Sequence, residues 1–167
     1  GSAQGWSEAA YRSTPVDVAS LGQALHGIRS LRGVQVHIVP GVIEQVGLPN
    51  VMRGEETQVL GVLQGLGPQV LIGLPGSHSK WVEVVEGRIT HFDTFMTGEV
   101  FAVLSEHSIL GRTQQHSATF DAEAFDRGVQ VALSAEGEIG VLSTLFSARS
   151  LGLTLRHLPL PAARRCW

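Results

Sequence analysis

Apolar positions recur along the chain with two different periods, and these periods separate helices from strands. Apolar spacing close to one helical turn predicts helices at residues 15–28, 51–66, 98–110, 121–134 and 140–151. Short apolar or alternating runs predict strands at residues 34–38, 69–74, 79–85 and 88–92. The sequence therefore predicts an α/β or α+β chain with a mixed sheet flanked by helices.

Capping and turn residues fix several boundaries of these elements. Thr14 is placed to cap the first predicted helix, and Asp121 to cap the fourth. Pro68 bars the second predicted helix from continuing. Glu86 and Gly87 separate the last two predicted strands and form a two-residue hairpin signal. Three of the predicted strands are thus expected to cluster.

Length, composition and charge limit the classes of function. The chain has 167 residues, enough for one domain with a real core or for part of a two-lobed enzyme. A formal charge of −3, without a run rich in lysine and arginine, argues against nucleic acid or an anionic membrane as the main partner. Glycine accounts for 20 of the 167 residues, above the usual ~7%. These features favour a small-molecule partner and several tight turns.

Cysteine content and hydropathy indicate the compartment. Cys166 is the single cysteine, so a disulfide framework or a cysteine metal site cannot be built within the chain. No stretch approaches ~20 uninterrupted apolar residues, and the start carries no basic and apolar leader. We expect a cytoplasmic protein.

Two adjacent acids at the start of the second predicted helix are the candidate catalytic residues. Glu55 and Glu56 lie in a first turn, where the helix dipole favours carboxylates, so both could simply support the helix. A carboxylate in a cleft can also act as a general base for a hydroxyl. Successive helical residues diverge by ~100°, so at most one of the two should face a site. Arg53, just before them, is suited to bind an acidic substrate, or else is a surface arginine.

A polar turn between two apolar strands is the candidate phosphate site. Its residues are Gly76, Ser77, His78, Ser79 and Lys80. A tight turn there points successive backbone N–H groups outward, and such a nest binds phosphate oxygens, with Lys80 adding positive charge. A plain hairpin turn is the alternative.

The same segment offers a rival chemistry. Ser77 and Lys80 have the Ser-x-x-Lys spacing of serine acyl-enzymes, which would make the protein a hydrolase. That signature needs the serine at a helix start, whereas a β-prone run follows Lys80 and no Lys-Thr-Gly run occurs downstream. A Walker phosphate loop, GxxxxGK[ST], does not occur in the sequence.

The segment that joins the last predicted strand to the third helix has polar binding potential. Thr97 can cap that helix, and a threonine and glycine loop at a helix start suits polar or anionic ligands. The seven histidines show no HxxxH or HExxH pairing, so we expect no metal held by the protein itself.

Several motifs together carry a family resemblance. In order, they are GSAQGW, VPGV, VMRGEETQVLG, LPGSHSKWV and FDTFMTGEVFAVLSEHSIL. This set closely resembles the 2-dehydro-3-deoxygalactonokinase family of sugar-acid kinases over roughly residues 1–153. The resemblance implies an actin-like, hexokinase-type fold of two ribonuclease-H-like lobes. It also implies transfer of the γ-phosphoryl group of ATP, with Mg²⁺, to the 6-hydroxyl of 2-dehydro-3-deoxy-D-galactonate in galactonate catabolism.

The resemblance also implies roles for individual residues. Glu55 is expected to be the catalytic base, by analogy with the aspartate at a helix start in glycerol and xylulose kinases, and Glu56 is the second choice. The turn at residues 76–80 is expected to hold phosphates. The residues expected to bind the substrate are Ser2, Gln4, Gly5, Trp6, Arg53, Thr97 and Glu99.

Two departures from the family pattern lead us to expect a chain that is incomplete at both ends. Family members begin with an Asp-Gly-Thr-Thr hairpin that binds Mg²⁺ and phosphate, and nothing before Gly1 supplies it. The residues LRHLPLPAARRCW resemble no adenosine-binding continuation. We therefore predict the end of a first lobe at residues 1–50, part of a second lobe at 51–158 and an atypical tail at 159–167. The alternative is a non-catalytic remnant that at most binds the sugar acid, and the sequence leaves a homo-oligomer open.

Overall fold

The computed structural model describes residues 7, 9–113 and 119–154, and the chain divides into two compact units between Glu99 and Val100. The elements that begin in the first unit are β1 (Arg12–Ser13), β2 (Val16–Asp17), the 3-10 helix η1 (Ala19–Ala24), β3 (His26–Arg29), β4 (Gln35–Ile38), β5 (Val42–Glu44), β6 (Asn50–Met52), α1 (Glu55–Val62), β7 (Gln69–Leu74), β8 (Ser79–Val85), β9 (Arg88–Phe95) and α2 (Thr97–His107). Those of the second are the 3-10 helix η2 (Gly111–Thr113), α3 (Ala122–Ala132), α4 (Ala135–Glu138) and α5 (Val141–Thr154).

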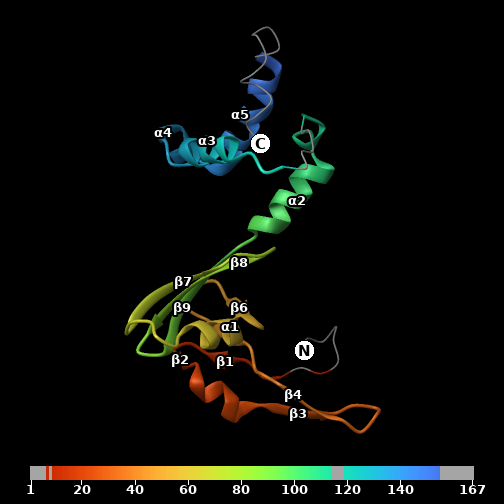
Figure 1. Ribbon diagram of the computed structural model, residues 1–167, viewed down its shortest axis with the longest axis vertical. Coiled ribbons are helices and arrows are strands. Elements are labelled where there is room, and N and C mark those ends of the chain that lie inside the picture. The colour runs from red at the N-terminus through yellow and green to blue at the C-terminus, as the bar shows by residue number, and fades with distance from the viewer. Residues whose placement is uncertain (1–6, 8, 114–118, 155–167) are drawn as a thin grey trace. The chain divides into compact units, whose positions relative to one another are not determined.

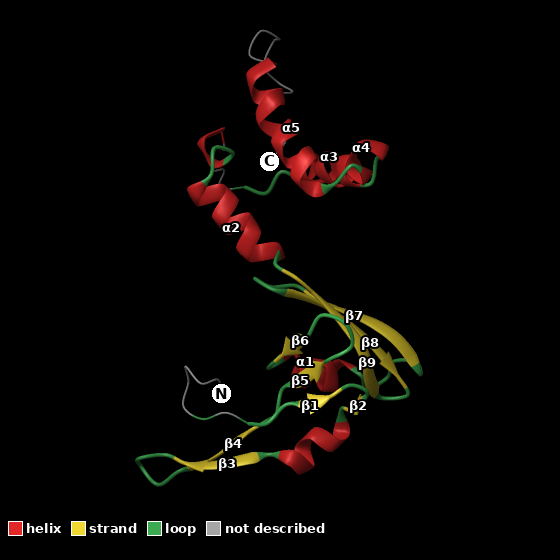
Figure 2. Cartoon of the chain, turned by 180° about the vertical axis from the view of Figure 1, so that it is seen from behind, coloured by secondary structure: helices red, strands yellow, loops and turns green. Residues whose placement is uncertain are grey.

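The first unit is built on an antiparallel sheet with the strand order β2-β9-β8-β7. A second, smaller sheet has the order β1-β5-β6, in which β1 and β5 run parallel. Strands β3 and β4 form a separate antiparallel pair. Figures 1 and 2 show β7, β8 and β9 side by side, with α1 next to β6 on one side of this sheet. The first unit is thus a mixed α/β structure, as predicted.

The core of the first unit lies between its two larger sheets and α1. The largest fully buried apolar side chains include Phe92, Met52 and Ile89. Strand β8 alternates between buried and exposed positions, so that Lys80, Val82 and Val84 share the buried face. The core cluster comprises Val16, Val18, Leu21, Val42, Met52, Val59, Ile72, Val82, Val84, Ile89 and Phe92. Both sheets therefore contribute to one core.

The strand predictions of the second half of this unit are confirmed. The strands predicted at 69–74 and 79–85 have the observed bounds of β7 and β8, and β9 runs three residues beyond the predicted end at 92. Glu86 and Gly87 form the predicted two-residue turn, with φ values of 49° and 74°. Positive φ at both positions gives a turn whose twist matches that of the strands.

The helix predicted at 15–28 is wrong. This segment contains β2, η1 and β3 instead. Val16 and Val18 are both buried, and two-residue spacing suits a strand that pairs with β9 better than a helix. The Asp17 carboxylate then accepts a hydrogen bond from the Ala19 amide at 2.9 Å, which starts the short 3-10 turn. Tertiary pairing thus overrides the local helical spacing.

The start of the second predicted helix also needs correction. The helix predicted at 51–66 begins only at Glu55, because Asn50–Met52 pairs with β5 as strand β6. The lobe boundary predicted between residues 50 and 51 stays a prediction, and in the structure these two residues belong to one strand. The observed division of the chain lies between Glu99 and Val100. Residues on both sides of position 50 therefore belong to one compact unit.

The second unit is helical in its described part. Helices α2, α3 and α5 correspond to the predictions at 98–110, 121–134 and 140–151, whereas α4 was not predicted. The Asp121 carboxylate caps α3 as expected, since it accepts the Ala124 amide at 2.9 Å. None of the described helices has the length and apolar character needed to cross a membrane.

Candidate functional site

The start of α1 holds the two candidate catalytic acids. Gly54 precedes the helix with a φ of 109°, a conformation that favours glycine, and so lets the chain turn from β6 into α1. The Glu55 carboxylate accepts the Arg53 amide at 2.8 Å, and the Glu56 carboxylate accepts the Gly54 amide at 2.7 Å. Both acids therefore bond back onto the turn, which satisfies backbone donors that a helix start leaves open.

The two carboxylates lie in different environments. Glu56 is 1% exposed, and its burial raises the pKa of its carboxyl above the ordinary 4.5, although backbone hydrogen bonds oppose the shift. Glu55 is only partly buried and lines a cavity. Of the two acids, only Glu55 lines this cavity, and the role of either in catalysis stays a prediction.

The polar turn between β7 and β8 forms the opposite wall of this cavity. β7 ends at Leu74 opposite Lys80, and residues 75–78 connect the two strands. The Gly76 amide donates to the Ser79 hydroxyl at 3.3 Å. We refer to residues 75–78 as the hairpin loop.

Lys80 does not extend toward the hairpin loop, contrary to the expectation that it adds charge there. It is 5% exposed on the core face of β8, where its ammonium donates to the Val51 carbonyl and to the Thr94 hydroxyl, each at 2.6 Å. Burial lowers the pKa of Lys80, and the charge of Glu55 partly raises it. Ser77 also lies in a loop between strands and not at a helix start, so the Ser-x-x-Lys reading finds no support.

The start of α2 packs directly on the hairpin loop. The amides of Gly98 and Glu99 both donate to the Ser77 carbonyl at 3.1 Å. A Cβ atom at Gly98 would lie 2.8 Å from the Gly76 carbonyl oxygen, so this close approach requires glycine. The side chains of His78 and Glu99 form a hydrogen bond of 2.5 Å between Nε2 and a carboxylate oxygen. Two segments distant in sequence, residues 53–58 and residues 74–78, therefore line the cavity, and the start of α2 packs on the hairpin loop without lining the cavity itself.

Thr97 is not the cap expected from the sequence. It is the first residue of α2, and its hydroxyl donates to the Phe95 carbonyl at 3.5 Å. It nevertheless lies one residue from Gly98, beside the hairpin loop. Its proposed contact with substrate stays a prediction, as does that of Glu99.

The cavity itself has a volume of about 310 Å³. Its lining residues are Arg53, Gly54, Glu55, Gln58, Leu74, Pro75, Gly76, Ser77 and His78. The Arg53 guanidinium carbon lies 4.9 Å from the centre of the Tyr11 ring, which steadies this cation at the rim of the site. An acidic residue, an arginine and a glycine-containing loop thus line a common space, a combination suited to an acidic, hydroxyl-bearing ligand.

Sequence reasoning missed Gln58 and Tyr11. Gln58 follows Glu55 by three residues on α1, so helical spacing would have placed both on one face. Tyr11 lies 42 residues before Arg53 and approaches it because β1 pairs with β5. No local signal in the sequence indicates that contact.

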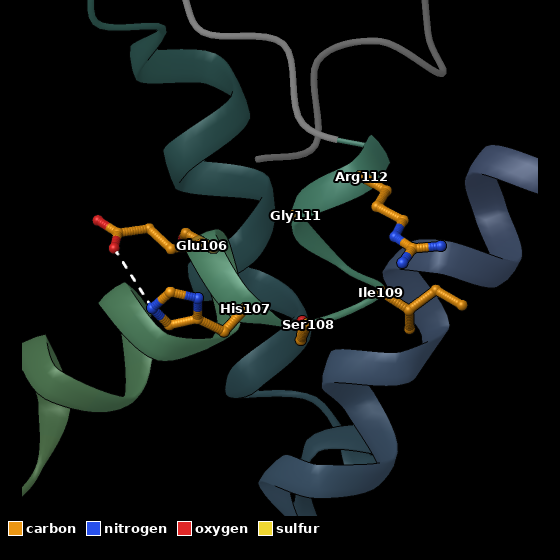
Figure 3. A pocket seen from close by; sticks show the side chains of 7 residues that line it. Glu106, His107, Ser108, Ile109, Gly111 and Arg112 are labelled. Carbon is orange, nitrogen blue, oxygen red and sulfur yellow. Dashed lines mark ion pairs between the residues drawn. The ribbon is translucent and has the colours of Figure 1, made fainter.

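A second cavity, of about 390 Å³, lies at the end of α2 (Figure 3). Its lining residues are Ser105, Glu106, His107, Ser108, Ile109, Gly111 and Arg112. Glu106 and His107 pair with each other at 3.7 Å and are 70% and 73% exposed. None of the predicted site residues lines it, so size alone does not make it the better candidate.

Four of the residues expected to bind substrate, Ser2, Gln4, Gly5 and Trp6, lie outside the described residues. The described part of the chain contains no group of three or more His, Cys, Asp or Glu side chains able to hold a metal ion.

Comparisons with known proteins agree on one family. A family model described as 2-keto-3-deoxy-galactonokinase matches residues 1–165. The chain is 37% identical over 152 residues to a Rhizobium meliloti (strain 1021) protein assigned as 2-dehydro-3-deoxygalactonokinase DgoK1. It is 36% identical over 154 residues to the 2-dehydro-3-deoxygalactonokinase of Escherichia coli (strain K12). Each alignment covers 90% of this chain and 49% of the relative, so the chain spans about half the length of these proteins.

The fold has a counterpart among solved structures. A crystal structure of a Sinorhizobium meliloti protein assigned as a 2-dehydro-3-deoxygalactonokinase superimposes with a TM-score of 0.79 at 34% sequence identity. The match covers 99% of this chain and 54% of that one.

Proposed function

The chain belongs to the 2-keto-3-deoxy-galactonokinase family, and we propose that its first unit carries the proton-accepting and phosphate-holding part of a kinase active site. The reaction is transfer of the γ-phosphoryl group of ATP to the 6-hydroxyl of 2-dehydro-3-deoxy-D-galactonate, in galactonate catabolism. The observation that carries the proposal is the cavity shared by Glu55, Arg53 and the hairpin loop. The complete protein has the actin-like, two-lobed ATPase fold in this proposal, and the reaction takes place in the cytoplasm.

Glu55 is the general base. Phosphoryl transfer passes through a loose transition state, so catalysis consists mainly of alignment and charge neutralisation. A base must first be within reach of the substrate hydroxyl, and only then does its pKa matter. Glu55 lines the cavity, whereas Glu56 is buried beside it. This difference supports Glu55 as the residue that accepts the hydroxyl proton.

Arg53 and the hairpin loop bind the two anionic partners. The planar guanidinium of Arg53 pairs with the carboxylate of the sugar acid. The backbone of Gly76, Ser77 and His78 holds phosphate oxygens of the nucleotide, with Ser79 supporting the loop. Mg²⁺ enters as part of MgATP, the nucleotide substrate of this proposal.

The test is release of ADP by this chain in the presence of MgATP and 2-dehydro-3-deoxy-D-galactonate. The matched control is the gluconate epimer, which differs in the configuration of one hydroxyl. ADP release that depends on the sugar acid supports the proposal. Saturable sugar-acid binding without ADP release would make this chain a binding remnant of the kinase. A folded sample that shows no sugar-acid binding and no turnover would refute the proposal for this chain.

A further inference from the structure

Lys80 is a buried cation at the centre of a side-chain network. Its ammonium donates to the Val51 carbonyl on β6 and to the Thr94 hydroxyl on β9. The Thr94 hydroxyl in turn donates to the Asn50 side-chain oxygen at 2.7 Å, and the Asn50 amide group donates to the Phe92 carbonyl at 2.9 Å. The network thus joins β8, β6 and β9 through consecutive hydrogen bonds, each of which orients the next.

Two of these strands, β6 and β8, adjoin the two walls of the cavity, and β9 leads to the start of α2, which packs on the hairpin loop. Val51 is two residues before Arg53, from which the chain enters α1. Lys80 is two residues after His78, the last residue of the hairpin loop. Thr94 is three residues before Thr97, the first residue of α2. A single ammonium group therefore lies where the three supporting segments converge.

Backbone pairing alone does not fix this geometry. β6 belongs to the sheet β1-β5-β6, whereas β8 and β9 belong to the sheet β2-β9-β8-β7, so no ladder joins β6 to them. The hydrogen bonds of Lys80, Asn50 and Thr94 link β6 of one sheet to β8 and β9 of the other. On β5, the Glu44 carboxylate makes a separate link, accepting the Phe92 amide at 3.1 Å. Apolar packing resists separation of the sheets, but hydrogen bonds determine their register.

The hydrogen bonds of Lys80 indicate a positioning role and not merely a side chain that occupies volume in the core. Burying an ammonium group costs free energy that an apolar side chain of the same length would not cost. A methionine, however, cannot donate to the Val51 carbonyl or to the Thr94 hydroxyl. Loss of the ammonium group would deprive the Val51 carbonyl and the Thr94 hydroxyl of this donor, while the apolar volume of the core stayed nearly the same.

We propose that Lys80 is a positioning residue for phosphoryl transfer: through Val51 and Thr94 it holds Glu55, the hairpin loop and the start of α2 in register. The role in phosphoryl transfer rests on the proposed function, but the mechanical coupling does not. In this proposal, Lys80 acts on the site through the segments that it orients and does not contact phosphate or sugar.

Amide hydrogen exchange on this chain tests the coupling without any substrate. The reporter amides are those of Gly54 and Gly76, one for each wall of the cavity, and that of Glu99 at the start of α2, and each is hydrogen-bonded. In Lys80→Met we expect all three amides to exchange about tenfold faster or more, because local opening no longer has to break the hydrogen bonds of the Lys80 ammonium group. Amides of α3 in the second unit should exchange at the parental rate.

Two further variants keep the test decisive. Thr94→Val removes the shared hydroxyl with little change in volume, so it should accelerate the same three amides even if Lys80→Met fails to fold. Val82→Ala, on the same buried face of β8, weakens the core without touching the network and should affect the first unit evenly. Exchange at the parental rate at the three amides in a folded Lys80→Met or Thr94→Val variant would overturn the proposal. Faster exchange spread evenly over the first unit in these variants, as expected for Val82→Ala, would overturn it too. Because no ligand is involved, failure of the kinase assay leaves this result unaffected.

Discussion

Glu55 and Glu56 are neighbours in the chain, yet their carboxylates accept hydrogen bonds from different amides and face different surroundings. Glu55 accepts from Arg53 and lines the cavity, whereas Glu56 accepts from Gly54 and is 1% exposed. Adjacent helical residues point in directions ~100° apart, which separates the two environments. The two acids therefore allow matched experiments in which only the position of the lost charge differs.

The first prediction concerns catalysis. In an active form of the kinase, Glu55→Gln should lower turnover at least ~100-fold and change sugar-acid binding little, since a general base acts mainly in the transition state. Steady-state ADP release measures the first quantity, and calorimetry the second. Glu56→Gln is the control and should retain most of the turnover. An equal loss in Glu56→Gln alone would move the base to that residue.

The second prediction concerns the stability contributed by Glu56. Its pKa is raised in the folded state, so the folded protein binds more protons than the unfolded chain between pH 4.5 and that raised value. The contribution of Glu56 to stability is therefore full below pH 4.5 and is lost as pH rises through the folded-state pKa. Urea unfolding at pH 5 and pH 7 should show a smaller difference in Glu56→Gln than in the parent. An unchanged difference would contradict the burial argument.

The third prediction concerns His91. The Glu44 carboxylate accepts a hydrogen bond from its ring at 2.8 Å, and this bond is the main cause that raises the pKa of His91 above 6.5, with Asp93 contributing. The stability that His91 contributes is thus complete below pH 6.5 and is lost as pH rises through the folded-state value. Thermal unfolding between pH 6 and pH 9 should show this decline in the parent and less of it in His91→Gln.

The fourth prediction concerns the junction between α2 and the hairpin loop. Gly98→Ala should destabilise the chain by about 1–3 kcal/mol, because the new methyl group meets the backbone of Gly76 and Ser77. Gly128→Ala in α3 is the matched control, since a Cβ there would meet nothing within 4 Å. That change should stabilise by up to about 1 kcal/mol through helix propensity. Urea unfolding measures both, and equal effects of the same sign would contradict the close approach at Gly98.

Much of the sheet could be predicted from local signals, and the errors have identifiable causes. β7 and β8 have strong apolar runs with a clear hairpin turn at Glu86 and Gly87, so their bounds follow from sequence alone. β5 and β6 have three residues each, too few to show a period, and they exist because they pair with each other. Local pattern therefore identifies long elements, whereas short strands depend on partners elsewhere in the chain.

The candidate site was predictable in part. The signals for Glu55 and for the hairpin loop were local, a helix start and a glycine turn. Lys80 was assigned to the loop because it is adjacent in sequence, although the alternation of β8 already placed it on the face of Val82 and Val84. The contact between Tyr11 and Arg53 depends on the pairing of β1 with β5, which no local pattern reveals.

The most direct test of the central claim is a calorimetric titration of this chain with 2-dehydro-3-deoxy-D-galactonate, alone and with Mg²⁺ and a non-hydrolysable ATP analogue. We predict saturable binding that persists in Glu55→Gln and weakens about tenfold or more in Arg53→Met, since that variant loses the guanidinium expected to pair with the sugar-acid carboxylate. An effect of the nucleotide on this binding would show that the phosphate site operates with it. No heat from a folded sample, or equal affinity in Arg53→Met, would contradict the assignment of the cavity as the sugar-acid site.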